Sequence, residues 1–167
     1  QKELIDLFID RGADKEARRA DGQTPILVAL NGDYWYRQSN LPADVPDAWN
    51  MVQHLLAKGA DYILSIACAA GDSQRVEEIL QQDPVQARRL DVGQRSPLTY
   101  AAQHGHIEIA RKLLALGADP NQPETLSSRG GALFAASAGN HLEVAKLLLQ
   151  HGADANAYAD SSGTCIT

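Results

Sequence analysis

Residues 105–121 read GHIEIARKLLALGADPN, and residues 140–156 read NHLEVAKLLLQHGADAN, so one phrase recurs 35 residues further along the chain. The triplet Gly-Ala-Asp that closes both phrases also begins at Gly12 and at Gly59. Each triplet follows a pair of large apolar residues. Recurrence of one phrase along a chain is the signature of a repeat architecture, in which every unit is one small supersecondary element.

The phrase and the residues before it predict two short helices in each unit. Ser96-Pro97 starts the first helix, because a hydroxyl caps a helix well and proline suits its first position. Small residues follow where two helices approach closely, and Gly105, or Asn140 in the later unit, tolerates the positive φ that ends the helix. A second helix follows, with one apolar stripe formed by Ile107, Ile109, Ala110, Leu113 and Leu114. Neither helix buries its apolar face alone, so we expect the units to stack.

The segment SPLTYAAQHGH at 96–106, followed by a leucine-rich segment that ends in Gly-Ala-Asp-Pro-Asn, resembles the ankyrin repeat. Related segments at 24–33, 62–72 and 131–141 extend the resemblance over nearly the whole chain. It implies an all-α ankyrin-repeat solenoid of stacked helix-turn-helix pairs, with extended loops called fingers on one side. The stretch AAGDSQRVEEILQQDP is similar to a variant seen in bacterial ankyrin-like proteins.

The resemblance divides a single ankyrin domain, residues 1–167, into successive repeats. They are a half repeat at 1–18, a repeat at 19–61 with an insertion at 34–49, a repeat at 62–89 that lacks a finger, repeats at 90–122 and 123–158, and a truncated start at 159–167. Because the chain begins and ends within a repeat, we expect either a fragment of a longer protein or a half-capped array.

Two departures from the repeat pattern are open to two interpretations each. The insertion gathers Tyr34, Trp35, Tyr36 and Trp49 on what we expect to be an ordered loop. These aromatics either anchor a partner or fold back and cover the edge of the stack, with covering slightly favoured. The absent finger after Asp61 leaves either a notch for a ligand or a tolerated deletion, which we favour.

Composition and charge exclude several function classes. The formal net charge is −6 and no basic stripe is present, which argues against a nucleic-acid partner. No apolar run is long enough to span a membrane. Cys68 lies in the apolar run ILSIACAA, which predicts a buried free thiol in a reducing compartment, and we therefore expect a cytoplasmic protein.

We expect no catalytic residue, metal or cofactor. Ser65 and Ser96 lack the setting of a nucleophile elbow, and adjacent carboxylates such as Glu77 and Glu78 do not converge on one point of a helix. The resemblance makes His106 and His141 the structural histidines at the starts of equivalent outer helices. Repeats about 10 Å apart would separate them too far for one zinc ion, whose ligand bonds are about 2 Å long.

Partners of ankyrin proteins dock on the finger tips and on the inner-helix face. Residues that the repeat template does not need for packing are therefore the candidates for partner binding. They are Ala20, Asp21, Gln23, Asn31, Val92, Gly93, Arg95, Gln103, His104, Ser127, Ser128, Gly130 and Ala138, together with the four insertion aromatics. Tyr100 is added because an amphipathic aromatic suits an interface, although packing against a neighbouring repeat explains it equally well.

Two functional hypotheses follow. The favoured one is a non-catalytic module or scaffold that binds another protein through fingers, inner helices and the insertion. The other is an accessory or targeting domain of a larger enzyme or effector whose catalytic part lies outside this chain. Both act by binding, and the fold alone names no partner.

Overall fold

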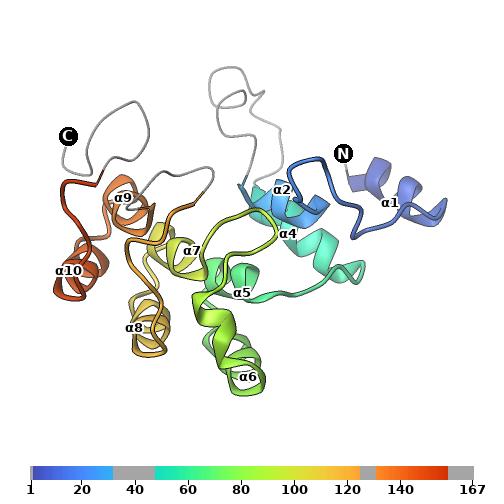
Figure 1. Cartoon of the computed structure of the whole chain (residues 1–167). Helices are drawn as coiled ribbons and strands as arrows, with labels where there is room; N and C mark the ends of the chain where they lie inside the picture. Colours follow the sequence, from blue (N-terminus) through green and yellow to red (C-terminus); the bar gives the residue numbers. More distant parts are fainter. Residues whose placement is uncertain (1, 32–47, 125–130, 158–167) are drawn as a thin grey trace. The chain divides into compact units, whose positions relative to one another are not determined.

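The computed structural model describes residues 2–31, 48–124 and 131–157, and the regular elements in these ranges are helices. The expected all-α repeat architecture is therefore confirmed. The contacts of the chain divide it into two compact units, residues 1–62 and 63–167. Figure 1 follows the chain through the helices of both units.

The first unit contains α1 (Lys2–Asp10), α2 (Pro25–Asn31) and α4 (Ala48–Ala57). Helices α2 and α4 pack together over a small apolar core that includes Ile26, Leu27, Val52 and Leu55. Proline at the first position of α2 confirms the start that the sequence predicts.

Helix α1 joins this unit mainly through polar contacts. None of its residues is fully buried, and Leu4, Leu7 and Phe8 remain exposed. Asp6 accepts a hydrogen bond from His54 Nε2 at 2.8 Å and pairs with Lys58 Nζ at 2.9 Å. These two contacts with the end of α4 hold the pKa of Asp6 below its usual range.

In its described residues, 63–124 and 131–157, the second unit has three helix pairs and one 3₁₀ turn. Its elements are α5 (Leu64–Ala70), α6 (Ser73–Gln82), η1 (Pro84–Arg88), α7 (Pro97–Gln103), α8 (Ile107–Ala115), α9 (Gly131–Ala138) and α10 (Leu142–Gln150). Helices α5, α7 and α9 form one row, and α6, α8 and α10 form a second row beneath it (Figure 1). We call these the inner and outer rows; α7 packs between α5 and α9 and also against its own partner α8.

The helix ends follow the local signals in the sequence. Ser96 Oγ accepts a hydrogen bond from the backbone N–H of Thr99 at 3.1 Å, and Pro97 is the first residue of α7. After the inner helices, Gly71 and Gly105 have φ of 72° and 75°, and Asn140 has φ of 56°. The predicted role of Gly105 and Asn140 in ending a helix is thus confirmed.

A histidine at the start of an outer helix ties two successive pairs of the second unit together. His106 Nε2 lies 3.1 Å from the carbonyl oxygen of Ala69, and His141 Nε2 lies 3.0 Å from that of Gln103. Each ring occupies the space beside a glycine. A Cβ on Gly71 would lie 2.5 Å from His106 Cε1, and one on Gly105 would lie 2.5 Å from His141 Nδ1.

Side chains also link successive Gly-Ala-Asp turns. In the second unit Asn121 Nδ2 donates to the carbonyl of Gly152 at 2.8 Å, and Asn121 Oδ1 accepts from the N–H of Asp154 at 2.8 Å. In the first unit two residues, Lys15 and Glu16, make the corresponding hydrogen bonds. Lys15 Nζ donates to the carbonyl of Lys58 at 2.8 Å, and Glu16 Oε1 accepts from the N–H of Asp61 at 3.0 Å.

Cys68 lies in the middle of α5 and is fully buried with a free thiol, as the sequence predicts. Burial raises the pKa of this thiol well above its ordinary value, because the thiolate would lose its hydration. Cys68 is therefore a core residue with a protonated side chain.

The structure describes only the end of the insertion, but it describes the whole of the short connection that lacks a finger. Most of the insertion, residues 34–47, lies outside the described residues. Trp49, which the sequence assigns to the insertion, instead occupies the first turn of α4 and is half-buried. Residues 58–63 form the whole connection from α4 to α5, and this short connection coincides with the boundary between the two units.

The glycine–histidine contact generates the first prediction. Replacing Gly105 with alanine places a Cβ in the left-handed region, at a cost of about 1–2 kcal/mol, and also displaces His141 from its carbonyl. Gly152→Ala is the matched control, because Gly152 has φ of 86° and a Cβ there meets nothing within 4 Å. We expect G105A to lower the free energy of unfolding by about 1 kcal/mol more than G152A in urea titrations. Equal losses in the two variants would contradict the contact.

Candidate interaction surface

The residues that the sequence nominates for partner binding fall into three sets. Tyr34, Trp35, Tyr36, Ser127, Ser128 and Gly130 lie outside the described residues. Ala20, Asp21, Gln23, Asn31 and Trp49 belong to the first unit, and Val92, Gly93, Arg95, Tyr100, Gln103, His104 and Ala138 belong to the second. The described candidates therefore lie on two separate units.

In the first unit, three candidates form one hydrogen-bonded chain. Asp21 pairs with Arg19 and accepts from the side-chain nitrogen of Gln23 at 3.2 Å, and Gln23 Oε1 accepts from Asn31 Nδ2 at 3.2 Å. The Arg19 hydrogen bond is the main reason that the pKa of Asp21 falls to about 2. Gln23 is buried, so it supports the turn from within, whereas Ala20 and Asp21 are exposed.

In the second unit, Arg95 gathers several candidates around its guanidinium group. This group lies over the Tyr100 ring, 4.6 Å from the ring centroid, and donates a hydrogen bond to Gln103 Oε1. Asp91 accepts from the backbone N–H of Arg95 at 3.0 Å and from the Tyr100 hydroxyl at 2.9 Å. Arg95 and Gln103, two of the candidates, lie eight residues apart in the chain and are joined by this hydrogen bond.

Tyr100 itself requires a correction. Its side chain has 0% relative exposure, because Arg95 covers the ring and α7 packs between α5 and α9. A partner therefore cannot contact Tyr100 in this structure. Packing within the stack, the alternative reading of the sequence, describes its position, and its contribution to the surface is to support Arg95.

Glu124, which sequence reasoning did not select, connects the loop before α9 to the start of α7. Its side chain is 1% exposed. Its Oε1 atom accepts hydrogen bonds from the backbone N–H of Ser96 at 2.9 Å and from Thr99 Oγ1 at 2.6 Å. The other oxygen, Oε2, makes no hydrogen bond within the described residues and lies 4.0 Å from Arg95 Nε. Burial raises the pKa of Glu124, and the two hydrogen bonds and Arg95 partly oppose that effect.

A signal for Glu124 was nevertheless present in the sequence. The ankyrin repeat that the segment at 96–106 resembles has a histidine at the place of Thr99, and the hydrogen bonding of that histidine must here be replaced or lost. The threonine hydroxyl donates instead to the carboxylate that follows the next Gly-Ala-Asp turn. A search for an acidic residue at that place would have found the partner.

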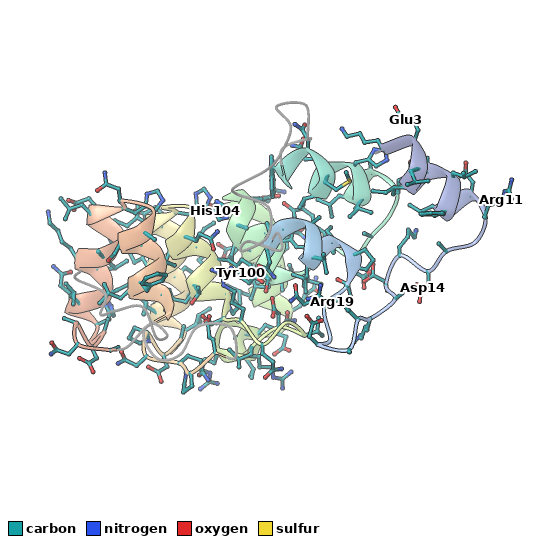
Figure 2. All side chains as sticks on the ribbon, turned by 90° about the horizontal axis from the view of Figure 1, so that it is seen from above. Glu3, Arg11, Asp14, Arg19, Tyr100 and His104 are labelled. Atoms are coloured by element: carbon teal, nitrogen blue, oxygen red, sulfur yellow. The ribbon has the colours of Figure 1, made fainter. Side chains whose placement is uncertain are left out.

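His104 directly follows the last residue of α7. It lies at the end of the helix opposite the loop that precedes α7, and Figure 2 labels both His104 and Tyr100. The side chain of His104 is exposed, and its ring stacks on that of His106 with centroids 6.2 Å apart. Partial burial is the main cause that lowers the pKa of His104, followed by the positive charges of His106, Arg95 and His141. Ala138, at the place in α9 that Gln103 has in α7, is also exposed, whereas Val92 is half-buried and Gly93 is buried.

The part of the chain that the structure describes holds neither a metal site nor a membrane-spanning helix. No group of three or more His, Cys, Asp or Glu side chains there could hold a metal ion. No helix there is long and apolar enough to cross a membrane.

Comparison with known families agrees with this geometry. A model of three ankyrin repeats matches residues 45–124, and a model of a single ankyrin repeat matches residues 132–160. The chain belongs to the ankyrin-repeat family. Ankyrin repeats generally act as protein–protein interaction modules and are typically non-catalytic. No individual curated protein matches the chain significantly.

The buried carboxylate that joins two ankyrin repeats generates the second prediction. Glu124→Ala leaves the buried N–H of Ser96 and hydroxyl of Thr99 without their acceptor, which lowers the free energy of unfolding by about 1–3 kcal/mol. Glu124→Gln keeps an amide oxygen for both donors, so we expect a smaller loss. Urea titrations of both variants measure these changes.

A comparison of the natural protein with Glu124→Gln tests the charge of Glu124. Because burial raises the pKa of Glu124 above its unfolded value, its stabilising contribution is fully present below the unfolded pKa and is lost as the pH rises through the folded pKa. The free energy of unfolding of the natural protein should therefore rise relative to that of E124Q between about pH 7 and about pH 4.5. A difference that stays constant over this interval would show that the carboxyl group is not perturbed.

Proposed function

We propose that the chain is a non-catalytic interaction module that holds a partner protein against the inner row of its second unit and the adjoining loops. Repeat proteins stack their units into extended surfaces, and they use these surfaces for binding. Ankyrin repeats in general bind other proteins, and we add that the contact lies on one face of one unit.

The distribution of charge between the two rows of helices is the observation that carries the proposal. The inner helices read LSIACAA, PLTYAAQ and GALFAASA, without a single Asp, Glu, Lys or Arg. Every outer helix carries charged residues, and several form ion pairs within one turn, such as Glu108 with Arg111 at 3.8 Å and Glu143 with Lys146 at 2.8 Å. Most of the inner-helix residues are buried within the stack, but those that are exposed, Phe134, Ser137 and Ala138 of α9, are also uncharged. Depletion of charge on an exposed surface is typical of the centre of a protein interface, whereas short-range ion pairs are typical of a hydrated face.

The exposed residues at the ends of the inner helices would supply the contact. Gln103, His104 and Ala138 are at least partly exposed in the last turn of α7 or α9 or just after it. Gln103 is already held by Arg95, so its side chain is fixed before a partner arrives. A preorganised side chain loses less entropy on binding than a mobile one.

A matched pair of exposed alanines tests the proposal. Ala138 is the last residue of inner helix α9, and Ala115 is the last residue of outer helix α8. We expect Ala138→Glu to weaken binding of a native partner at least tenfold, about 1.4 kcal/mol, because it puts a long charged side chain into the contact. Ala115→Glu should leave binding unchanged.

The measurement has two steps. The natural protein first captures partners from native extract, and mass spectrometry identifies them. The affinity of the strongest partner is then measured by calorimetry for both variants, after their thermal unfolding has been compared. Equal affinities for the two variants would sink the inner-row assignment, and a chain that captures no partner would count against the module itself.

A further inference from the structure

We propose that His104, His106 and His141, which we call the histidine edge, contact an acidic segment of the partner protein, and that acidification tightens this contact. The inference rests on the proposed function, since the histidine edge borders the inner row of the second unit. It adds the chemistry of the partner and a dependence on pH.

The histidine edge is a continuous cluster in space. His104 ends α7, and its ring stacks on that of His106, which begins α8. His141 begins α10, and its ring bonds the carbonyl of Gln103, the residue before His104. All three histidines therefore surround the C-terminal end of one inner helix.

The charges that act on His104 in the second unit are positive. His106, Arg95 and His141 each lower the pKa of His104, and no carboxylate contributes to its shift. Arg95 is itself close to the Glu124 carboxylate, 4.0 Å away, so the histidines decide how much charge the edge presents. In a chain of net charge −6, a local surface of this sign selects acidic partners through charge complementarity.

The nearest acidic side chains on the elements that carry the edge are already engaged. Glu108, two residues after His106, lies 3.8 Å from Arg111, and Glu143, two residues after His141, lies 2.8 Å from Lys146. Asp91 accepts hydrogen bonds from Arg95 and Tyr100, and Asp72, next to the Gly71 that His106 packs against, accepts one from the N–H of Arg75. Carboxylates of a partner would therefore meet little competition from this unit.

The stack of repeats tolerates the added charge. A backbone carbonyl only accepts hydrogen bonds, so Nε2 carries the hydrogen in both His106 and His141. Protonation then adds a hydrogen at Nδ1 and leaves the bond from Nε2 to the carbonyl in place. A hydrogen added at Nδ1 therefore does not disrupt the contacts that join successive repeats.

Binding and protonation reinforce one another. A bound carboxylate favours the imidazolium form, so a complex with an acidic segment takes up protons and becomes tighter as the pH falls. A ligand that raises the pKa of one histidine by about one unit gains about tenfold in affinity at the acidic limit.

The probe is a short fluorescent oligoglutamate peptide, and its dissociation constant for the whole chain is measured by anisotropy from about pH 8 to about pH 5.5, above the range where glutamate titrates. We expect the natural protein to bind about tenfold more tightly at the lower pH. His104→Gln should reduce this change to about threefold, and His104→Lys should bind the peptide at the higher pH more tightly than the natural protein does.

His151→Gln is the matched control. His151 is exposed in the same unit, but its Nδ1 bonds the carbonyl of Leu147 in its own helix, away from the edge. This variant should keep the full change with pH. An oligolysine peptide should not bind, and thermal unfolding checks that each variant is folded.

Several outcomes would overturn the inference. They are an equal pH dependence of the natural protein and His104→Gln, no gain from His104→Lys, or binding of an oligonucleotide or of phosphatidylserine vesicles in preference to the peptide. If any of these occurs while Ala138→Glu still weakens binding of the native partner, the proposed function stands and only the acidic contact fails.

Discussion

The stack in the second unit depends on a contact between an aromatic nitrogen and a carbonyl at the end of the preceding inner helix. The last carbonyls of a helix have no partner within it, and burying them unpaired costs about 1–3 kcal/mol each. His106 and His141 supply the missing donors from the following outer helix. The contact leaves no room for a side chain at Gly71 or Gly105, so helix end, inter-repeat spacing and glycine are fixed together.

The Thr99–Glu124 pair shows how a repeat survives the loss of a template residue. Threonine is too short to reach the next repeat, and a glutamate from that repeat comes to it instead. The exchange has a cost, because a carboxylate with one unbonded oxygen sits in the interior. It also gives Arg95 a charged neighbour on its inner side, and thereby helps to place the guanidinium that lies between Tyr100 and Gln103.

The local parts of the fold were predictable from the sequence, and the contacts between distant residues were not. Proline at the start of α2 and α7, and Gly105 and Asn140 at helix ends, act through their own backbone preferences, so the sequence predicts them well. The burial of Tyr100 depends on Arg95 and on two neighbouring helices, and the place of Trp49 depends on where α4 begins. Glu124 reaches its partners over 25 and 28 residues, a distance at which repeat spacing indicates a neighbour but not a hydrogen bond.

The burial of Cys68 makes this residue a built-in probe of the motion of the repeats. A thiol with a raised pKa and no solvent contact does not react with alkylating reagents while α5 is folded. Its modification therefore has to wait for an opening of α5. The rate of labelling at Cys68, read separately from that at Cys165, measures how often that helix separates from α6 and α7. The rate of reaction at this sulfur atom thus reports how often the stack opens locally.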